Sequence, residues 1–599
     1  MPQDVLSLTG CLWTPRALAR AEHAQTARHL GLPEIIAPLL AARELDSPGA
    51  ARAFLQPRLK ELPDPLSLRD MDAAIARLVE AVEAGERIGV FGDYDVDGAT
   101  SSALLTRYFR ALGLAVRVYI PDRLSEGYGP NPDAMRKLAE EGLRLVITVD
   151  CGITAFEALE AAQDAGLGVI VTDHHQAREA LPAALAVINP NRLDETFPHK
   201  QLAGVGVAFY LAMGLNRALR ERGWFTQTRP EPPLKPLLDL VAVGTVADVA
   251  AITGINRALV SAGLRVTAQK ENAGIAALME AAELKVDHRG VRCSQVGFQI
   301  GPRINAGGRL GRGELGHQLL STEDLAEARR IAAELDASNQ ARQSIEKEMV
   351  AQAVAQVEGS GQLERARGIV VSSPGWHPGV VGIVASRLVD RFHRPALVIS
   401  IDDDGVGKGS GRTVPGVDLL AAVDRCAEYL DHYGGHKAAC GVTIQAENIA
   451  AFTETFFTAL AELPEAAFTP RLAVDAPLPV ELAQLGLAAQ LQQFAPFGMG
   501  NPEPVLVLPG VSAWNGRLIK GRHVACQLVR PDGGAGVEAI GFGVAPGPVA
   551  DALLSNQGAW DVAGTLSVDH WRGQERLQFR IKDVRAAQAL PWDQEPARN

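Results

Sequence analysis

The sequence predicts an α/β protein of several domains, with a parallel sheet, a long connecting helix, a smaller domain and a small C-terminal β-barrel. Three observations support this. Apolar runs that end in acidic residues alternate with helical patterns in the first half of the chain. Apolar residues then recur at helical spacing from 321 to about 357, and short apolar runs broken by Gly, Pro and Asn follow residue 466. With 599 residues, 47% of them apolar, we expect several cores in domains of roughly 100 to 200 residues.

The N-terminal stretch has helical patterns at residues 17–30 and 46–55 but no chemical motif. We expect residues 1–65 to form a helical cap packed on the first domain. No apolar run reaches membrane-spanning length, and the first ten residues lack a basic region followed by an apolar core. These features predict a cytoplasmic protein without a membrane partner.

The first acidic segment follows the apolar run of residues 87–91. It contains three alternating carboxylates: Asp93, Asp95 and Asp97. Such crowded charges repel one another unless a cation neutralises them, so a metal site is the first hypothesis. An EF-hand calcium loop opens in the same way, but its required twelfth-position Glu is Leu104 here, so this alternative fails. A solvated acidic turn without an ion stays open at this point.

Further candidate ligands follow two more predicted strands. Asp150 ends the apolar run of residues 143–149, and Asp173, His174 and His175 follow the run of residues 167–172. Parallel strands joined by crossover helices gather ligands outside their carboxyl ends. Neighbouring side chains diverge on an extended backbone. One His therefore binds metal in this interpretation, while the other faces the substrate or orients a ligand.

A fourth segment, residues 236–248, adds Asp239 and Asp248 in an apolar, helix-like context. Either acid is compatible with a plain helix end. Asp248 follows the Gly244-Thr245 break, and we favour it as the ligand.

In this order and spacing, the motifs resemble the DHH phosphoesterases, and within them the single-strand-specific exonucleases. The matching segments are Gly92-Asp-Tyr-Asp-Val-Asp-Gly98, Val149-Asp-Cys-Gly152, Thr172-Asp-His-His175 and Gly244-Thr-Val-Ala-Asp248. Later segments resemble the same family: Gly301-Pro-Arg-Ile-Asn-Ala-Gly-Gly-Arg309, His377-Pro-Gly-Val-Val-Gly-Ile383 and Gly434-Gly-His-Lys-Ala-Ala439. The resemblance runs from about Leu66 into the C-terminal domain. Cys440 departs from it, because Ala or Gly is usual there.

The resemblance implies how the rest of the chain is divided. We expect a DHH catalytic domain at 66–320, a connecting helix at 321–362, and a smaller α/β DHH-associated domain at 363–463. An OB-like nucleic-acid-binding barrel is expected at 464–599. A stiff connecting helix would set the spacing of the two α/β domains and so define a cleft for a single strand.

Three Gly-rich segments carry basic or polar side chains and are predicted to be turns that grip DNA. The candidate contacts are Arg303, Asn305, Arg309, Lys408, Ser410, Arg412, His436 and Lys437. Glycine lets the backbone approach a phosphate, and Arg offers a planar donor fork. A solvated basic loop for the first segment and a flexible linker for the second remain alternatives. No Walker loop occurs, and the net charge of -12 does not exclude a locally basic groove.

In the predicted barrel, aromatic and basic side chains are candidates for stacking and phosphate contacts, although some of the aromatics are expected to fill the barrel. They are Trp514, Arg517, Lys520, Arg522, Trp571 and Arg572. The six cysteines are scattered without a Cys-x-x-Cys pair, so zinc ribbons and structural disulfides are not expected.

The expected metal ligands are Asp93, Asp95, Asp97, Asp150, His174 and Asp248, and the expected catalytic residues are Asp95, Asp97, His174 and His175. Mixed carboxylate and imidazole ligands suit two Mn²⁺ ions, with Mg²⁺ as a substitute. We therefore expect phosphodiester hydrolysis.

The resemblance implies a 5′ to 3′ exonuclease that degrades single-stranded DNA to mononucleotides in repair and recombination. It also implies single-strand-binding protein and a RecQ-type helicase as partners. Two alternatives are a phosphodiesterase for cyclic dinucleotides or very short RNA, typically a shorter chain, and a non-catalytic DNA-binding relative. The complete ligand set argues against the latter.

Overall fold

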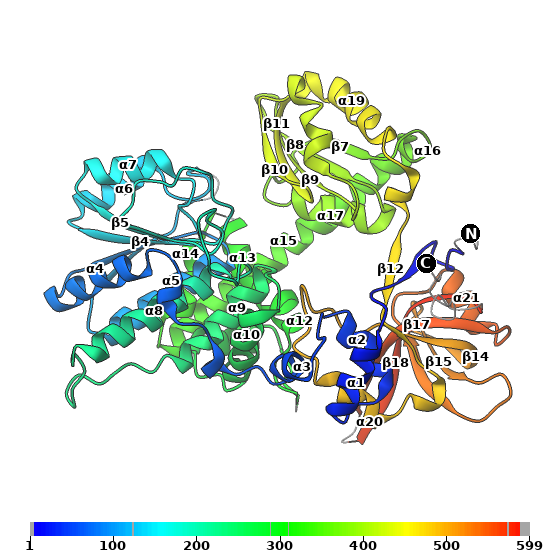
Figure 1. Cartoon of the computed structure of the whole chain (residues 1–599). Coiled ribbons are helices and arrows are strands. Elements are labelled where there is room, and N and C mark those ends of the chain that lie inside the picture. The colour runs from blue at the N-terminus through cyan, green and yellow to red at the C-terminus, as the bar shows by residue number, and fades with distance from the viewer. Residues whose placement is uncertain (1–4, 123–124, 288, 310, 572–573, 588–599) are drawn as a thin grey trace. The chain divides into compact units, whose positions relative to one another are not determined.

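The structure, a computed structural model, describes residues 5–122, 125–287, 289–309, 311–571 and 574–587 (Figure 1). Tertiary contacts divide the chain into two units. The first unit comprises residues 53–341 and 496–502, and the second comprises residues 1–52, 342–495 and 503–599. No helix among the described residues is both long and apolar enough to cross a membrane.

The first unit contains a five-stranded, fully parallel sheet with the order β3-β2-β4-β5-β6. Its strands are β2 (Ile88–Gly92), β3 (Val116–Tyr119), β4 (Leu145–Val149), β5 (Gly168–Thr172) and β6 (Ala186–Ile188). Every residue of β2 and β4 is buried, as expected for parallel strands covered on both faces. The predicted parallel sheet is confirmed.

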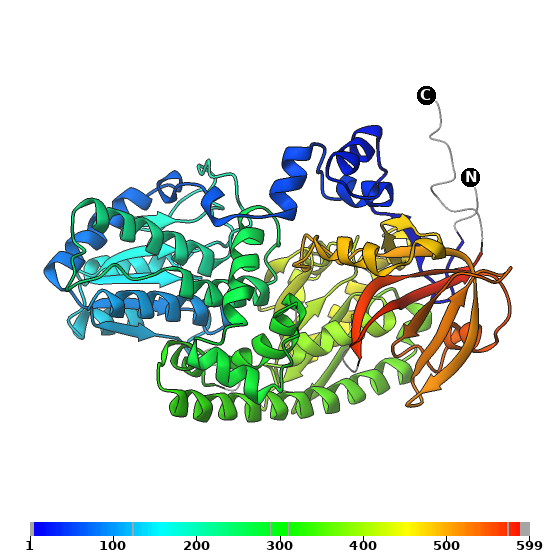
Figure 2. The ribbon, with the colours of Figure 1, turned by 90° about the horizontal axis from the view of Figure 1, so that it is seen from below.

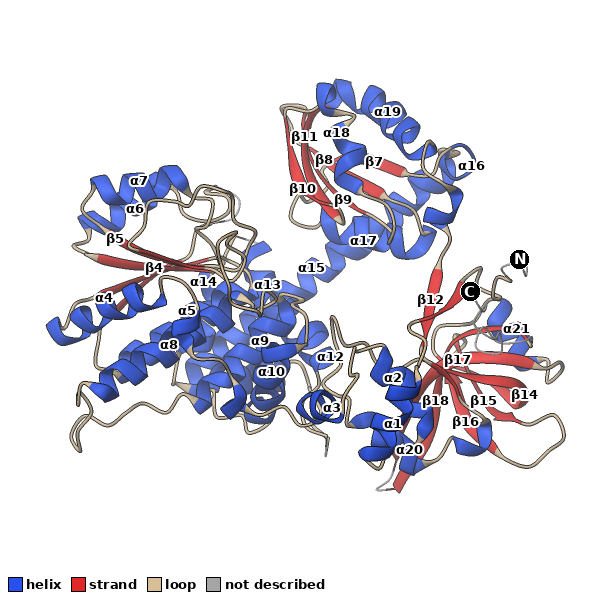
Figure 3. Ribbon diagram, in the orientation of Figure 1, coloured by secondary structure: helices blue, strands red, loops and turns tan. Residues whose placement is uncertain are grey.

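Helices cover both faces of this sheet (Figure 3). One face packs against α4 (Met71–Ala84), α5 (Val96–Ala111) and α8 (Gly204–Glu221), and the other against α6 (Pro132–Glu140) and α7 (Phe156–Asp164). The helices that follow are α9 (Leu238–Ala247), α10 (Gly254–Thr267), α11 (Ala273–Ala281), α12 (Cys293–Gln295), α13 (Gly301–Arg309) and α14 (Glu314–Ser321), with a π-helical turn at Val296–Ile300 before α13. Because α5 begins directly after β2, the acidic turn sits at the carboxyl edge of the sheet.

The expected long helix is present as α15 (Leu325–Gly359), a single uninterrupted helix (Figure 2). Its 35 residues span about 50 Å at 1.5 Å per residue. Asp324 caps its start by accepting a hydrogen bond from Ala326 N at 2.8 Å. The helix therefore begins a few residues after 321, because Ser321 is the last residue of α14.

After α15 comes a mixed sheet with the order β10-β11-β9-β8-β7, in which only β7 and β8 run parallel. Its strands are β7 (Ile369–Pro374), β8 (Ala396–Ile401), β9 (Val406–Arg412), β10 (His432–His436) and β11 (Ala439–Gln445). On one face lies α17 (Val381–Phe392), and on the other lie α18 (Leu419–Asp424) and α19 (Ile449–Ala461), while the short α16 (Gln362–Arg365) precedes β7. This is the predicted smaller α/β domain.

The C-terminal module is a closed five-stranded barrel in which β14 pairs with both β15 and β17. Its strands are β14 (Leu506–Ile519), β15 (His523–Val529), β16 (Gly536–Gly541), β17 (Trp560–Trp571) and β18 (Gln574–Ala586), and the flanking elements are β13 (Ala476–Pro477), α20 (Leu485–Gln492) and α21 (Pro548–Leu554). The OB-like barrel expected from the sequence is confirmed.

The N-terminal segment joins this second unit through strand β1 (Leu12–Pro15), which pairs in parallel with β12 (Arg471–Val474). Trp13 is buried, and its Nε1 donates to Asp583 Oδ2 at 2.8 Å. Helices α1 (Ala21–His29), α2 (Ala37–Ala41) and α3 (Pro48–Leu55) follow. By their contacts, residues 5–52 belong to the second unit and residues 53–65 to the first. The expectation that the whole N-terminal segment packs on the first domain is therefore wrong for residues 5–52, while the other predicted domain boundaries stay predictions.

Candidate metal centre

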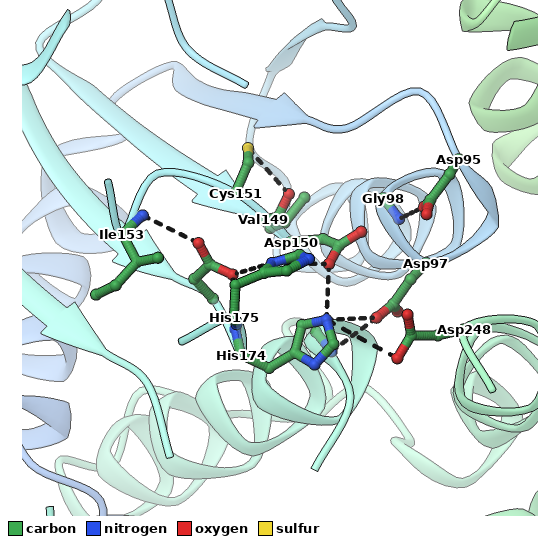
Figure 4. Close-up of polar contacts among 12 residues, drawn as sticks. Asp95, Asp97, Gly98, Val149, Asp150, Cys151, Ile153, His174, His175 and Asp248 are labelled. Atoms are coloured by element: carbon green, nitrogen blue, oxygen red, sulfur yellow. Dashed lines mark hydrogen bonds and ion pairs between the residues drawn. The ribbon is translucent and has the colours of Figure 1, made fainter. Parts of the chain in front are cut away.

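The predicted ligands gather at the carboxyl edge of the parallel sheet (Figure 4). Asp93 and Asp95 lie between β2 and α5, and Asp97 lies in the first turn of α5. Asp150 follows β4, His174 follows β5, and Asp248 caps the end of α9. Because parallel strands end at one edge, segments far apart in the sequence meet there.

His174 lies at the middle of this cluster, with its ring directed at three carboxylates (Figure 4). Its Nε2 is 3.1 Å from Asp150 Oδ1 and 3.8 Å from both Asp97 Oδ2 and Asp248 Oδ2. Potential ligand atoms of Asp97, His174 and Asp248 all lie within 4.8 Å of one another, as do those of Asp93, Asp95 and Asp150. Asp150 thus belongs to the group with Asp93 and Asp95, and it also contacts His174 of the other group. The two groups therefore provide two adjacent positions for cations.

The electrostatics of the cluster favour bound cations. Burial, reinforced by the charge of Asp95, raises the pKa of Asp97 to about 7. Burial and the charge of Asp97 raise the pKa of Asp248 to about 8, and the same two causes hold the pKa of Asp150 well above its ordinary range. Carboxylates removed from water and placed side by side resist ionisation unless positive charge compensates them.

The donor set fits a divalent metal. Burial, followed by the neighbouring charge of His175, lowers the pKa of His174 to about 4, which leaves a neutral imidazole. His174 Nε2 and Asp150 Oδ1 are buried and lie 3.1 Å apart without the geometry of a hydrogen bond, so neither atom has a hydrogen-bond partner within the described part of the chain. A neutral imidazole nitrogen and carboxylate oxygens are the ligand forms that divalent metals require.

The local sequence explains how Asp97 is held. Its Oδ2 accepts a hydrogen bond from Gly204 N at 2.7 Å and its Oδ1 accepts one from Val205 N at 2.8 Å, at the positive N-terminus of α8. A Cβ on Gly204 would lie 3.0 Å from Asp97 Oδ2, and one on Gly244 would lie 2.3 Å from Thr100 Oγ1. Only glycine fits at Gly244 without movement of its neighbours. The break expected at Gly244-Thr245 is wrong, because both residues lie inside the continuous helix α9.

Asp173 follows β5 as the sequence predicts, but it is absent from the expected metal ligands and catalytic residues. It is almost fully buried and accepts hydrogen bonds from Ile153 N at 2.9 Å and His174 N at 2.7 Å, and its Oδ1 lies 2.8 Å from His175 Nδ1. Although burial would raise the pKa of Asp173, the hydrogen bond and charge of His175, followed by the Ile153 amide, outweigh burial and lower the pKa. Asp173 therefore holds the His175 ring and the backbone amide of His174.

Tyr128 also contacts the site from the loop between β3 and α6. Its hydroxyl donates to the Asp150 carbonyl oxygen at 3.0 Å and lies 3.2 Å from His175 Nδ1. A single Tyr in an irregular loop carries no pattern that would reveal this role. By contrast, the Asp-His-His tripeptide already contained the signal for Asp173.

Asp239, the rival of Asp248, lies in the first turn of α9. Its buried carboxylate accepts a hydrogen bond from the Leu240 amide at 2.6 Å. Among the described residues, the groups with metal-ligand spacing contain Asp248 and not Asp239.

The first Gly-rich segment is helical, so the prediction of a turn is wrong there. Residues Gly301–Arg309 form α13, which carries Arg303, Asn305 and Arg309. Arg303 Nε pairs with Asp336 Oδ1 at 2.9 Å. A Cβ on Gly308 would lie 2.7 Å from the Tyr94 carbonyl oxygen, so this glycine permits close packing against the acidic turn. Gly308 thus serves the packing of a helix. A Gly-rich composition alone does not distinguish such a helix from a loop.

The other two Gly-rich segments are strands, so the prediction of turns is wrong here as well. Lys408, Ser410 and Arg412 alternate along β9 and share one face of the mixed sheet. His436 ends β10, and Lys437 lies in the turn that follows. Strand pairing places His436 opposite Ala439 and Ala439 opposite Arg412, so all three occupy the same row.

The barrel candidates are placed as follows. Trp514 on β14 is 59% exposed, and Arg517, Lys520 and Arg522 are exposed around the β14–β15 turn. The Trp571 side chain and Arg572 lie outside the described residues.

Comparison with known proteins identifies the family. The chain matches the models of the DHH family, N-terminal domain, at residues 87–245, the DHHA1 domain at 366–462 and the RecJ OB domain at 474–583. It is 38% identical over 583 residues to the single-stranded-DNA-specific exonuclease RecJ of Dickeya dadantii, covering 95% of this chain and 98% of that one. The Escherichia coli RecJ is 37% identical over 584 residues, with coverage of 95% and 98%.

Among solved structures, RecJ from Thermus thermophilus in complex with Mn²⁺ matches with a TM-score of 0.80 and 32% identity, over 98% of this chain and 81% of that one. A Mg²⁺ complex of the same protein also matches, with a TM-score of 0.74, 30% identity and coverage of 96% and 79%. The ligand cluster and these metal complexes agree on a metal-dependent site. The chain belongs to the RecJ family, a group of single-stranded-DNA-specific exonucleases within the DHH family.

Proposed function

We propose that the protein is a metal-dependent exonuclease that degrades single-stranded DNA from the 5′ end to mononucleotides. The observation that carries this proposal is the convergence of five carboxylates and one imidazole at the carboxyl edge of the parallel sheet. RecJ relatives that span nearly this whole chain support the substrate class. DNA repair and recombination are the processes that this activity serves.

In this proposal, two Mn²⁺ ions, with Mg²⁺ as a substitute, occupy the centre. The residues that hold them are Asp93, Asp95, Asp97, Asp150, His174 and Asp248. When bound, divalent ions lower the pKa of water and neutralise charge that develops on a phosphate. Among these ligands, we propose that Asp95, Asp97 and His174 are also essential for catalysis. His175 Nδ1 is engaged by Asp173, so its Nε2 is available to contact the scissile phosphate.

Ser410 and Arg412 form a candidate phosphate site at the start of α17. Arg412 Nη1 donates to Ser410 Oγ at 2.9 Å. A Cβ on Gly382 would lie 3.0 Å from Arg412 Nη2 and 3.1 Å from Ser410 Oγ, so the first turn of α17 lies against both side chains. A helix N-terminus beside Arg and Ser donors suits an anionic phosphate oxygen.

In the mixed sheet, Ser410 on β9 lies opposite Gly441 on β11, and Gly441 lies opposite Gly434 on β10. A Cβ on Gly434 would meet no atom within 4 Å, and one on Gly441 would meet only Gly409 O at 4.0 Å. Neither glycine has the left-handed backbone that would require it. Glycine inside a strand costs about 0.5–1 kcal/mol relative to Ala. The open space above both glycines, beside Lys408 and His436, leaves room for a DNA backbone in this proposal.

The first unit contributes Arg303, Asn305 and Arg309 of α13 to the proposed DNA contacts. Arg303 must then share its guanidinium between Asp336 and a phosphate. Lys437, in the turn after β10, adds a further cationic contact. We also propose that the protein acts in the cytoplasm with single-strand-binding protein and a RecQ-type helicase.

The test is degradation of single strands labelled at either end, in the presence of Mn²⁺. The proposal predicts labelled mononucleotides first from the 5′-labelled strand and no cleavage without a divalent metal. Mononucleotides released first from the 3′ label would contradict the polarity. Faster turnover of a dinucleotide than of a long strand would instead indicate the short-substrate activity of other DHH enzymes.

A further inference from the structure

The turn that follows Asp248 has a strained backbone. Ala250 N donates to Thr245 O at 3.2 Å and Val249 N donates to Val246 O at 3.2 Å, so α9 ends in a Schellman motif. This motif usually places glycine at the left-handed position, but here Val249 occupies it with φ of 62°. A β-branched residue resists this conformation. Val249 is also 58% exposed, so its own packing offsets little of the strain.

The segment after Val249 is held from two sides. Asn256, at the start of α10, donates through Nδ2 to Ala251 O at 3.1 Å. From the other side, Ile252 N donates to Met499 O at 2.7 Å. Ile252 is almost fully buried, so water does not replace this hydrogen bond easily.

Met499 belongs to a hairpin of residues 496–502, which by its contacts is part of the first unit, although the residues on both sides of it belong to the second. Gly498 and Asn501 exchange backbone hydrogen bonds of 2.9 and 3.1 Å across it. Asn501 is fully buried, and its Nδ2 donates to Pro496 O at 2.8 Å. The same carbonyl accepts from the buried Arg257 of α10 at 3.3 Å.

The glycines of this hairpin are required by its fit against residues 251 and 252. Gly500 has φ of 71°, and a Cβ there would lie 3.1 Å from Ala251 Cβ. A Cβ on Gly498 would lie 3.0 Å from Ile252 Cγ1. The Gly498-Met-Gly-Asn501 sequence is therefore shaped to lie against the turn that follows Asp248.

We propose that the 496–502 hairpin positions Asp248 for metal binding. By holding Ile252, it keeps Val249 left-handed and so keeps the Asp248 carboxylate beside His174. Without the hairpin contact, Val249 relaxes to a common backbone conformation and the carboxylate leaves the cluster. This inference rests on the proposed function in one respect, the assignment of Asp248 as a ligand.

The test measures Mn²⁺ binding to the full-length protein without DNA, from the signal of free Mn²⁺ in electron paramagnetic resonance. Asn501→Ala should weaken the Mn²⁺ affinity about fivefold. This factor corresponds to the lower end of the energy that a non-glycine residue needs to adopt the left-handed conformation. Val249→Gly in the same protein should restore the affinity, because glycine adopts the left-handed conformation without strain. The matched control is Lys270→Gly, which relieves another left-handed residue (φ of 58°) in the turn after α10 and should restore nothing.

Thermal melts establish that each variant is folded at the assay temperature. If Asn501→Ala does not fold, Gly500→Ala disturbs the contact with Ala251 and carries the same expectation. Asp248→Ala distinguishes the assignment of Asp248 as a metal ligand from the positioning role of the hairpin. Unchanged Mn²⁺ affinity in Asp248→Ala would overturn the ligand assignment itself. Weakened binding in Asp248→Ala but wild-type binding in Asn501→Ala would overturn only the hairpin's role, as would equal rescue by Lys270→Gly.

Discussion

Asp239→Asn isolates the energetic cost of one buried carboxylate outside the metal centre. Asp239 is 3% exposed, and burial raises its pKa from the ordinary 3.8 to about 7. Asn has nearly the same shape and keeps an oxygen that accepts from Leu240 N. The substitution therefore removes the charge without removing the hydrogen bond.

The pKa shift fixes the sign of the effect on stability. Below pH 3.8 the carboxyl group is protonated in both the folded and the unfolded chain, so it does not favour either state. Between pH 3.8 and about 7 the folded state holds the proton more tightly, so the free energy of unfolding falls as the pH rises. Above about pH 7 the decrease in the free energy of unfolding is constant at about 4 kcal/mol. About 2–3 kcal/mol of this decrease develops between pH 5 and pH 8.

The assay is scanning calorimetry of the metal-free protein at pH 5 and pH 8. From pH 5 to pH 8, the free energy of unfolding of Asp239→Asn should rise by about 2–3 kcal/mol relative to wild type. For a unit of this size, this corresponds to about 5 °C in melting temperature. Asp72→Asn, which removes an exposed charge from the first turn of α4, is the matched control. If Asp239→Asn differs from wild type in melting temperature by the same amount at both pH values, the Asp239 carboxylate is not destabilising. Loss of nuclease activity in Asp239→Asn would restore this residue as a candidate ligand.

Two further substitutions test single contacts. Tyr128→Phe removes the hydroxyl beside His175, so kcat on single-stranded DNA should fall about tenfold with Mn²⁺ affinity unchanged, and an unchanged kcat would exclude a positioning role. Trp13→Ala removes the buried indole that donates to Asp583, so calorimetry should show the barrel destabilised by about 3–5 kcal/mol, whereas an unchanged melt would mean that the N-terminal strand does not stabilise the barrel.

The parallel sheet and its ligand edge could be predicted because two simple rules act together there. Buried parallel strands produce continuous apolar runs, as in Leu145–Val149, and their ends converge on one edge. An acid or imidazole directly after such a run therefore lies at the site, which is how Asp150 and His174 could be anticipated. Asp248 required the additional clue of Gly244, whose missing side chain makes room for Thr100.

The glycines of the later segments could not be interpreted correctly from composition. Gly308 serves helix packing against Tyr94, whereas Gly434 lies in a strand with open space above it. Both look like turn residues in the sequence, because glycine lowers the preference for helix and for strand alike. Only the surroundings of the missing Cβ distinguish a close contact from an open surface.

Contacts between segments far apart in the chain also could not be predicted from the sequence. The two glycines of Gly498-Met-Gly-Asn501 indicate a turn, but its partner, Ile252, lies far earlier in the chain and has no distinguishing pattern. Tyr128 is a single residue in a loop. In both cases the role depends on tertiary contacts that no local periodicity encodes.

The central claim is that the acidic cluster binds two divalent ions that hydrolyse DNA. Its most direct test counts the Mn²⁺ ions bound per chain and measures single-strand degradation in wild type and in Asp150→Ala, because Asp150 lies within reach of both groups of ligands. We expect two Mn²⁺ ions per chain in wild type. In Asp150→Ala we expect weaker Mn²⁺ binding and degradation slower by at least about a hundredfold. Wild-type Mn²⁺ binding or near-normal degradation in Asp150→Ala would contradict the central claim.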